Sequence, residues 1–304
     1  MTTADAAAER SGTAREGLLA RHPLVFFFLI AFAGTWLVEL LYMLSADGAG
    51  LLPFRLPLLP VGIWIALSVF LGPFLSAFIM TGVTEGRAGI GRLLRRIVRW
   101  RVGIRWYLFA LIGIPVILVL SAIVLLLGNL ASFQGLSSTM ALGYLLTFAP
   151  VFFLGGPLGE EPGWRGFALP RLQSLHGPLL GSLILGPLWA LWHLPLFFVP
   201  SWDTPPTMLN IGLFLISCTF STITFTWVFN NTKGSVLMTM LVHTSNNAIL
   251  ALLFSAFIVS VHDTFIAIIG YGTLALLVVA LTRGRIGYQH YQQEEDPDLA
   301  TASR

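Results

Sequence analysis

The chain has 304 residues, of which 56% are hydrophobic and only 10% are charged. A soluble globular domain carries about 25% charged residues, so water cannot be the main solvent around this protein. The net charge is +3, and seven arginines fall between positions 87 and 105, where two apolar segments flank them. This placement argues against a nucleic-acid-binding protein and favours a segment that faces anionic lipids.

Eight apolar segments are long enough to cross a membrane, since about 20 helical residues span a hydrocarbon core of about 30 Å. They cover residues 23–45, 57–83, 106–130, 140–158, 178–200, 207–230, 234–258 and 263–282. The sequence therefore predicts an all-α, polytopic bundle of about eight transmembrane helices, forming one domain over residues 23–285. Residues 1–22 are predicted to be a polar segment and not a signal peptide, because charges of both signs occur there. Residues 286–304 are predicted to be a polar, disordered tail.

The basic residues predict the orientation of these segments. If both termini lie in the cytoplasm, the inner loops hold residues 87–105, Arg165, Arg171, Lys233, Arg283 and Arg285, whereas the outer loops hold only Arg55. This asymmetry follows the positive-inside rule and favours an integral protein of the cytoplasmic membrane. Residues 87–101 alternate arginines with apolar side chains, which predicts an amphipathic helix on the membrane surface.

Glycine–proline pairs at 72–73, 156–157, 177–178 and 186–187 predict kinks or helix starts, because proline lacks a backbone donor. The single cysteine, Cys218, lies in an apolar segment and is predicted to be a small buried side chain.

A first polar motif contains Glu160, Glu161 and Arg165 next to a predicted span. On a helix, Glu161 and Arg165 share a face and can pair, whereas Glu160 points about 100° away without a local partner. A carboxylate in an apolar cavity is suited to act as a general base. Alternatively, the motif is an acidic turn solvated at the membrane surface.

Two further motifs lie inside predicted spans. Trp189 precedes His193 by four residues, and His243 precedes Asn247 by four, so each pair shares a helical face. Taken alone, each motif would be read as interhelical packing and hydrogen bonding, which is common for such side chains in membranes.

Considered together, the three motifs predict one shared site, since polar groups at bilayer depth are costly and normally functional. One geometric difficulty remains, because counting 1.5 Å per residue from the span ends puts His193 and His243 about 9 Å apart in depth. Glu39, near the outer end of the first span, is predicted to be a surface carboxylate that reaches the polar boundary.

The three motifs, in this order and spacing, resemble the CAAX protease and bacteriocin-processing family of intramembrane endopeptidases, which includes the type II CAAX prenyl endopeptidases. The resemblance covers about residues 140–260, the predicted catalytic core. Trp189 stands where the family most often has phenylalanine.

The resemblance implies roles for individual residues. Glu160 and His193 would activate the attacking water, and His243 and Asn247 would stabilise the oxyanion or orient Glu160. Glu161, Arg165 and Trp189 would support the site. If a metal ion is present, Glu160, His193 and His243 would be a plausible zinc ligand set, although a glutamate-activated water without metal is favoured.

The leading hypothesis is thus an endopeptidase acting on a membrane-associated, possibly prenylated protein or peptide near the cytoplasmic face. A proton-coupled transporter is an alternative, because intramembrane Glu and His also form proton relays. A catalytically silent scaffold of the same family is a further alternative.

Overall fold

The computed structural model describes residues 17–46, 50–55, 61–125, 127, 138–199, 204–256 and 263–295, and this part of the chain contains helices and no strands. Seven of its helices are long and apolar enough to cross a membrane, and a bent helix pair brings the number to eight if it counts as one span. The predicted all-α bundle of about eight membrane helices is confirmed.

The first half of the chain forms three long helical segments, two of them interrupted by π-helical turns. Its elements are α2 (Leu18–Arg21), α3 (Pro23–Leu44), α4 (Val61–Val69), η1 (Phe70–Phe74), α5 (Leu75–Ile97), α6 (Ile104–Leu108), η2 (Phe109–Gly113) and α7 (Ile114–Leu125).

The second half begins with shorter helices, continues with three long ones and ends with the short helix α15. Its elements are α8 (Ser138–Leu154), α9 (Pro157–Gly163), η4 (Trp164–Ala168), α10 (Leu169–His176), α11 (Pro178–Trp192), η5 (Leu194–Phe198), α12 (Met208–Asn231), α13 (Val236–Ala256), α14 (Asp263–Thr282) and α15 (Tyr288–Glu295).

The predicted fourth span, residues 140–158, is not a single helix. A bend of 49° separates residues 141–154 from residues 157–176. Arg165 is fully buried, so the expectation that it lies in an inner loop is wrong. The reason is the turn at Gly156, whose φ of +106° directs the chain back into the bundle, where it continues as α9 and α10.

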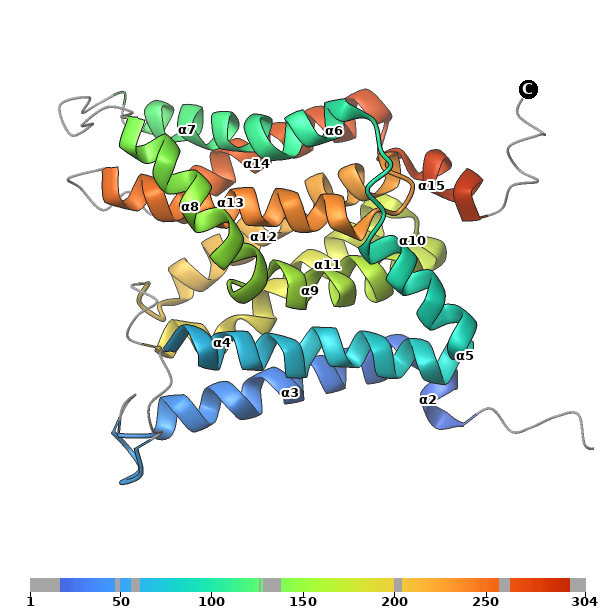
Figure 1. Ribbon diagram of the computed structural model, residues 1–304, viewed down its shortest axis with the longest axis horizontal. Helices are drawn as coiled ribbons and strands as arrows, with labels where there is room; N and C mark the ends of the chain where they lie inside the picture. The colour runs from blue at the N-terminus through green and yellow to red at the C-terminus, as the bar shows by residue number, and fades with distance from the viewer. Residues whose placement is uncertain are drawn as a thin grey trace, which may run out of the picture.

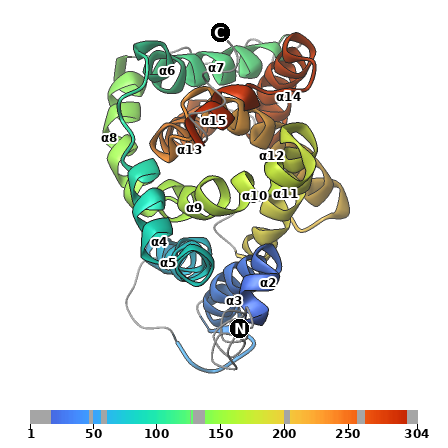
Figure 2. The same ribbon diagram turned by 90° about the vertical axis from the view of Figure 1, so that its right-hand side faces the viewer.

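α9 lies in the middle of the bundle, between α13 on one side and the layer of α4 and α5 on the other (Figure 1). Viewed from the end, α9 lies inside the ring formed by the other helices, and α11 is part of that ring next to α12 (Figure 2). Gly163 permits the close approach of α9 to η1, the turn between α4 and α5. A Cβ on Gly163 would lie 2.6 Å from the carbonyl oxygen of Pro73 in η1. The segment that bears the first motif is therefore the inner element of the fold.

Three of the four glycine–proline pairs have the predicted effect. Gly72 has a non-helical conformation within η1, and Pro157 and Pro178 occupy the first turns of α9 and α11. Proline is tolerated there because the amide it lacks has no helical partner. Pro187 lies inside α11.

The arginine-rich segment is helical as far as Ile97, and a positive φ of +62° at Gly86 separates this part from the apolar part of α5. The end of α5, α10 and α15 lie at one end of the bundle, together with α2 (Figure 1).

The predicted disorder from residue 286 is wrong for α15, whereas residues 296–304 lie outside the described residues. Tertiary contacts order this polar helix. The ring of Tyr291 packs 5.3 Å from that of Phe229 on α12, and its hydroxyl accepts a hydrogen bond from Arg96.

Candidate active site

Glu160 lies in the first turn of α9 and is 3% exposed. The backbone of Gly156 passes directly beside its carboxylate, because a Cβ on Gly156 would overlap Oε1 of Glu160. The helix N-terminus carries partial positive charge, which favours an acidic side chain in this turn. Gly156 therefore has two effects: its positive φ forms the turn before α9, and its missing Cβ leaves room for the carboxylate of Glu160.

The second motif surrounds this carboxylate. The indole Nε1 of Trp189 donates a hydrogen bond of 2.7 Å to Oε2 of Glu160. His193 follows at the end of α11, and its Nε2 lies 4.0 Å from the same oxygen. The Nδ1 atom of His193 lies 2.8 Å from the carbonyl oxygen of Trp189, which fixes the plane of the ring. The structure therefore brings Glu160, Trp189 and His193 together as predicted.

The third motif connects to the site through Glu161. Oε1 of this carboxylate lies 2.9 Å from Nη1 of Arg165 and 2.9 Å from Nδ1 of His243. The predicted Glu161–Arg165 pair is present. Glu161 also binds His243, whereas the family resemblance implied that His243 would orient Glu160 or stabilise the oxyanion. The guanidinium carbon of Arg165 lies 4.5 Å from the ring centroids of both Trp189 and Phe225, so the whole pair is enclosed by aromatic rings.

Both imidazoles contact one indole. The ring centroid of Trp189 lies 5.6 Å from that of His193 and 5.5 Å from that of His243. The two histidines, which come from different helices, therefore share one aromatic neighbour.

Asn247 lies on α13, one turn beyond His243. Its Nδ2 donates a hydrogen bond of 3.1 Å to the carbonyl oxygen of Gly155, and its Oδ1 accepts one from Asn246. The carboxamide is thus oriented against the bend between α8 and α9, next to Glu160.

These side chains open onto a cavity of about 370 Å³. Glu160, Trp189, His193, His243 and Asn247 all line it. Much of its remaining wall is apolar, and the buried thiol of Cys218 belongs to this wall, as the sequence predicted for a small buried side chain.

Glu39 is the residue that sequence reasoning missed. It was predicted to be a surface carboxylate, but it is 5% exposed and lines the same cavity as Glu160. The hydroxyl of Ser68 donates to its Oε1 at 3.1 Å, whereas its Oε2 has no hydrogen-bond partner among the described residues. The available signal was the carboxylate itself within an apolar helix, and position relative to the span end proved a poor guide to its exposure.

The zinc ligand set implied by the family resemblance consists of Glu160, His193 and His243. Among the described residues, no group of three His, Cys, Asp or Glu side chains is placed to hold a metal ion. The Nδ1 atoms of His193 and His243 lie against a protein carbonyl and Glu161, which leaves Nε2 as the available nitrogen of each ring. The side chains of Glu160, His193 and His243 are nevertheless not arranged as a zinc site in the part of the chain that the structure describes.

Comparison with known proteins finds similarity to the same family that the motifs resemble. Residues 145–249, which include all three motifs, match the family model described as type II CAAX prenyl endopeptidase Rce1-like. The chain is 32% identical over 142 residues to a protein named CAAX prenyl protease 2 from Methanococcus maripaludis. This alignment covers 43% of the chain and 52% of the relative, so the chain spans about half the length of the curated relative it matches.

Glu39 and the arginine-rich end of α5 lie outside residues 145–249. The helices long enough to cross a bilayer, together with this match, identify an integral, multi-pass membrane protein. The resemblance to the CAAX protease family is confirmed over residues 145–249, the segment that builds the centre of the site.

Proposed function

We propose that this protein is an intramembrane endopeptidase that hydrolyses a peptide bond of a membrane-associated protein or peptide with a water activated by Glu160 and His193. The observation that carries the proposal is the buried pair itself. Oε2 of Glu160 and Nε2 of His193 lie 4.0 Å apart on the wall of one cavity.

The hydrogen bonds support a role for each atom in water activation. The Nδ1 of His193 faces a carbonyl oxygen, which can only accept, so Nδ1 carries the proton and Nε2 of the neutral ring is an acceptor. A water between Nε2 and the Glu160 carboxylate would donate one hydrogen to each. Its oxygen lone pair is then directed away from both groups, toward a substrate carbonyl carbon.

In the first step, the water oxygen bonds to the carbonyl carbon while Glu160 takes one water proton. The carbonyl π bond breaks, and its electron pair becomes the oxyanion of a tetrahedral intermediate. In the second step, the carbon–nitrogen bond breaks, and Glu160 returns the proton to the leaving amine. The immediate products are a carboxylic acid and an amine, which become a carboxylate and an ammonium group once the acid proton passes to the amine, and the carboxylate of Glu160 is regenerated.

Asn247 and His243 supply donors for the oxyanion. A carboxamide can donate without titrating, and Asn247 is already oriented by its bond to the carbonyl of Gly155. Glu161 accepts from Nδ1 of His243 and stabilises the ring when it is protonated, in which case Nε2 can also donate.

The substrate proposal follows the relative's name and the cavity. The relative is called a CAAX prenyl protease, and the cavity here combines an apolar wall with the polar groups described above. A protein or peptide with a lipidated, CAAX-type end suits such a wall. The arginine-rich end of the bundle is proposed to face the cytoplasm, in accordance with the positive-inside rule.

The test is hydrolysis by the purified chain in detergent or in liposomes, using farnesylated CAAX peptides and unprenylated controls of the same sequence, with product masses identifying the bond cleaved. Glu160→Gln retains size and the bond from Trp189 but removes the base, so the rate is expected to fall at least about a hundredfold. Undiminished cleavage by this variant would exclude the proposed role. A parallel series with chelator and with added Zn²⁺ is expected to leave the wild-type rate unchanged.

A further inference from the structure

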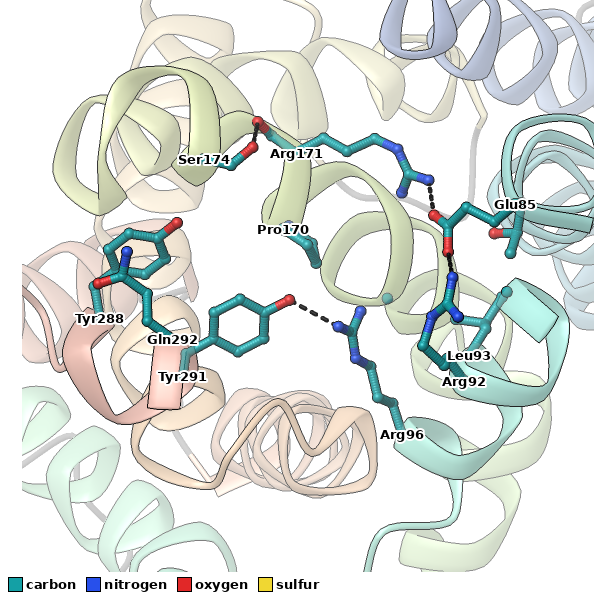
Figure 3. A pocket seen from close by; sticks show the side chains of 13 residues that line it. Glu85, Arg92, Leu93, Arg96, Pro170, Arg171, Ser174, Tyr288, Tyr291 and Gln292 are labelled. Atoms are coloured by element: carbon teal, nitrogen blue, oxygen red, sulfur yellow. Dashed lines mark hydrogen bonds and ion pairs between the residues drawn. The ribbon is translucent and has the colours of Figure 1, made fainter. Parts of the chain in front are cut away.

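A second cavity, of about 650 Å³, lies at the arginine-rich end of the bundle, between α5, α10 and α15. Its lining does not include any residue of the three motifs. Figure 3 shows the side chains of Arg92, Arg96, Arg171 and Tyr291 arranged around a central opening with Pro170 between them.

The lining is basic and rich in donors. It contains three arginines and a single carboxylate, Glu85, which leaves a net charge of two positive units. Hydroxyl groups of Ser174, Tyr288 and Tyr291 also belong to it. Guanidinium and hydroxyl donors surrounding a cavity with positive charge are the usual recognition chemistry for a phosphate group.

Contacts among the lining residues hold the arginines in place. Glu85 forms ion pairs with Arg92 and with Arg171 (Figure 3). Arg171 also donates to the carbonyl oxygen of Phe167, with its guanidinium carbon 3.6 Å from the centroid of that ring. Arg96 donates to the hydroxyl of Tyr291 at 2.8 Å. The donors come from separate helices and are positioned before any ligand enters, which lowers the entropic cost of binding.

The sequence of α5 places this cavity at the level of lipid headgroups. Gly89, Arg92, Leu93 and Arg96 recur at helical spacing and line the cavity. On the opposite face, Leu94 and Val98 are 47% and 63% exposed. An exposed apolar face beside a basic cavity, with Trp100 62% exposed just beyond, is typical of a helix at the boundary between hydrocarbon and headgroups.

We propose that this cavity binds a phosphate group, supplied by an anionic phospholipid headgroup. A bound phosphate would connect Arg92 and Arg96 on α5 with Arg171 on α10. Because α10 continues from the segment that carries Glu160, the lipid would also stabilise the inner part of the bundle. The inference is independent of the proposed peptidase activity.

The test is thermal unfolding of the purified full-length protein in non-ionic detergent, titrated with four additives. These are short-chain phosphatidylglycerol, short-chain phosphatidic acid, phosphatidylcholine with the same acyl chains, and inorganic phosphate. A ligand that binds the folded state raises the unfolding temperature as its concentration passes its dissociation constant. The two anionic lipids are expected to stabilise the protein, and phosphatidylcholine is not.

Two double variants distinguish binding in the cavity from general electrostatic attraction between anionic lipids and the arginine-rich helix. Arg92→Gln with Arg96→Gln removes two charges from the cavity, whereas Arg87→Gln with Arg95→Gln removes two charges from the same helix outside it. Since two charge-assisted bonds are lost, the cavity pair is expected to weaken anionic-lipid binding roughly tenfold or more, and the control pair by less than about twofold. Circular dichroism without additive verifies that both variants fold.

Equal losses in the two variants would overturn the proposal, as would equal stabilisation by phosphatidylcholine. If inorganic phosphate stabilises the protein as strongly as the lipids do, and only the cavity pair abolishes the effect, the phosphate site stands but the lipid source is rejected.

Discussion

The indole of Trp189 donates its N–H to the carboxylate of Glu160 at 2.7 Å, so the aromatic residue of the second motif holds the proposed base of the first. Both residues are buried, and both line the cavity. A hydrogen bond to a charged group contributes about 1.5–3 kcal/mol, enough to select one position of the carboxylate.

Trp189→Phe tests this contact. Phenylalanine is the residue most often found here in the family that the chain resembles, so the ring is expected to fit while the donor is lost. The carboxylate would then be less well positioned, and kcat is expected to fall about tenfold with KM nearly unchanged. Steady-state kinetics on the purified variant provide the measurement, and an unchanged kcat would show that the bond has no positioning role.

Much of this site could be predicted from the sequence, because local spacing determined it. The i, i+4 spacings predicted that Glu161 pairs with Arg165 and that Glu160 points elsewhere. Three polar motifs within apolar sequence predicted a common cavity, which Glu160, Trp189 and His193 share in the folded chain.

The parts that could not be predicted depend on tertiary packing. Sequence alone cannot show that Gly156 bends the chain into the bundle, so the sequence places residues 159–177 in an inner segment between two spans. The partner of His243 depends on how α13 packs against α9, and this arrangement assigns it to Glu161. Glu39 was predicted to be exposed because it lies near the end of a span, whereas the packing of α3 against α4 buries it.

Glu161→Gln is expected to destabilise the fold as well as the site. The carboxylate is fully buried between Arg165 and His243, and its loss leaves an uncompensated buried cation. Breaking such a pair costs about 3–5 kcal/mol. Thermal unfolding in detergent should therefore show a large decrease in melting temperature.

Glu85→Gln is the matched comparison for stability. Glu85 also pairs with arginine, but it and Arg92 are 31% and 46% exposed. Partly exposed pairs contribute about 0–1 kcal/mol, so a small shift in melting temperature is expected. A shift as large as that of Glu161→Gln would contradict the assignment of the buried pair as the stabilising one.

Glu39→Gln tests whether the second carboxylate of the cavity contacts substrate. Its Oε1 is held by Ser68, and its Oε2 is an acceptor without a partner among the described residues. The amide would keep an acceptor for Ser68 and place a donor where Oε2 now lies, which would oppose a substrate N–H that binds there. A mismatch of this kind is expected to raise KM about tenfold with little change in kcat.

Ser68→Ala serves as the control for Glu39, because it removes the supporting hydroxyl and leaves the carboxylate. Its KM is expected to change less than that of Glu39→Gln. If both variants retain the wild-type KM, Glu39 is a structural residue only.

Gly156→Ala is expected to abolish most activity for two reasons that a single control can separate. The φ of +106° is unfavourable for alanine, and the added Cβ would overlap Oε1 of Glu160. Gly177 also has a positive φ, +77°, at the start of α11, but a Cβ there meets no atom within 4 Å. Both alanine variants should therefore lose about 1–2 kcal/mol of stability through backbone strain. Only Gly156→Ala should also displace the carboxylate and lower kcat, by about a hundredfold if Glu160 is the general base. Equal activity in the two variants, measured on folded protein, would show that the backbone beside Glu160 does not position it.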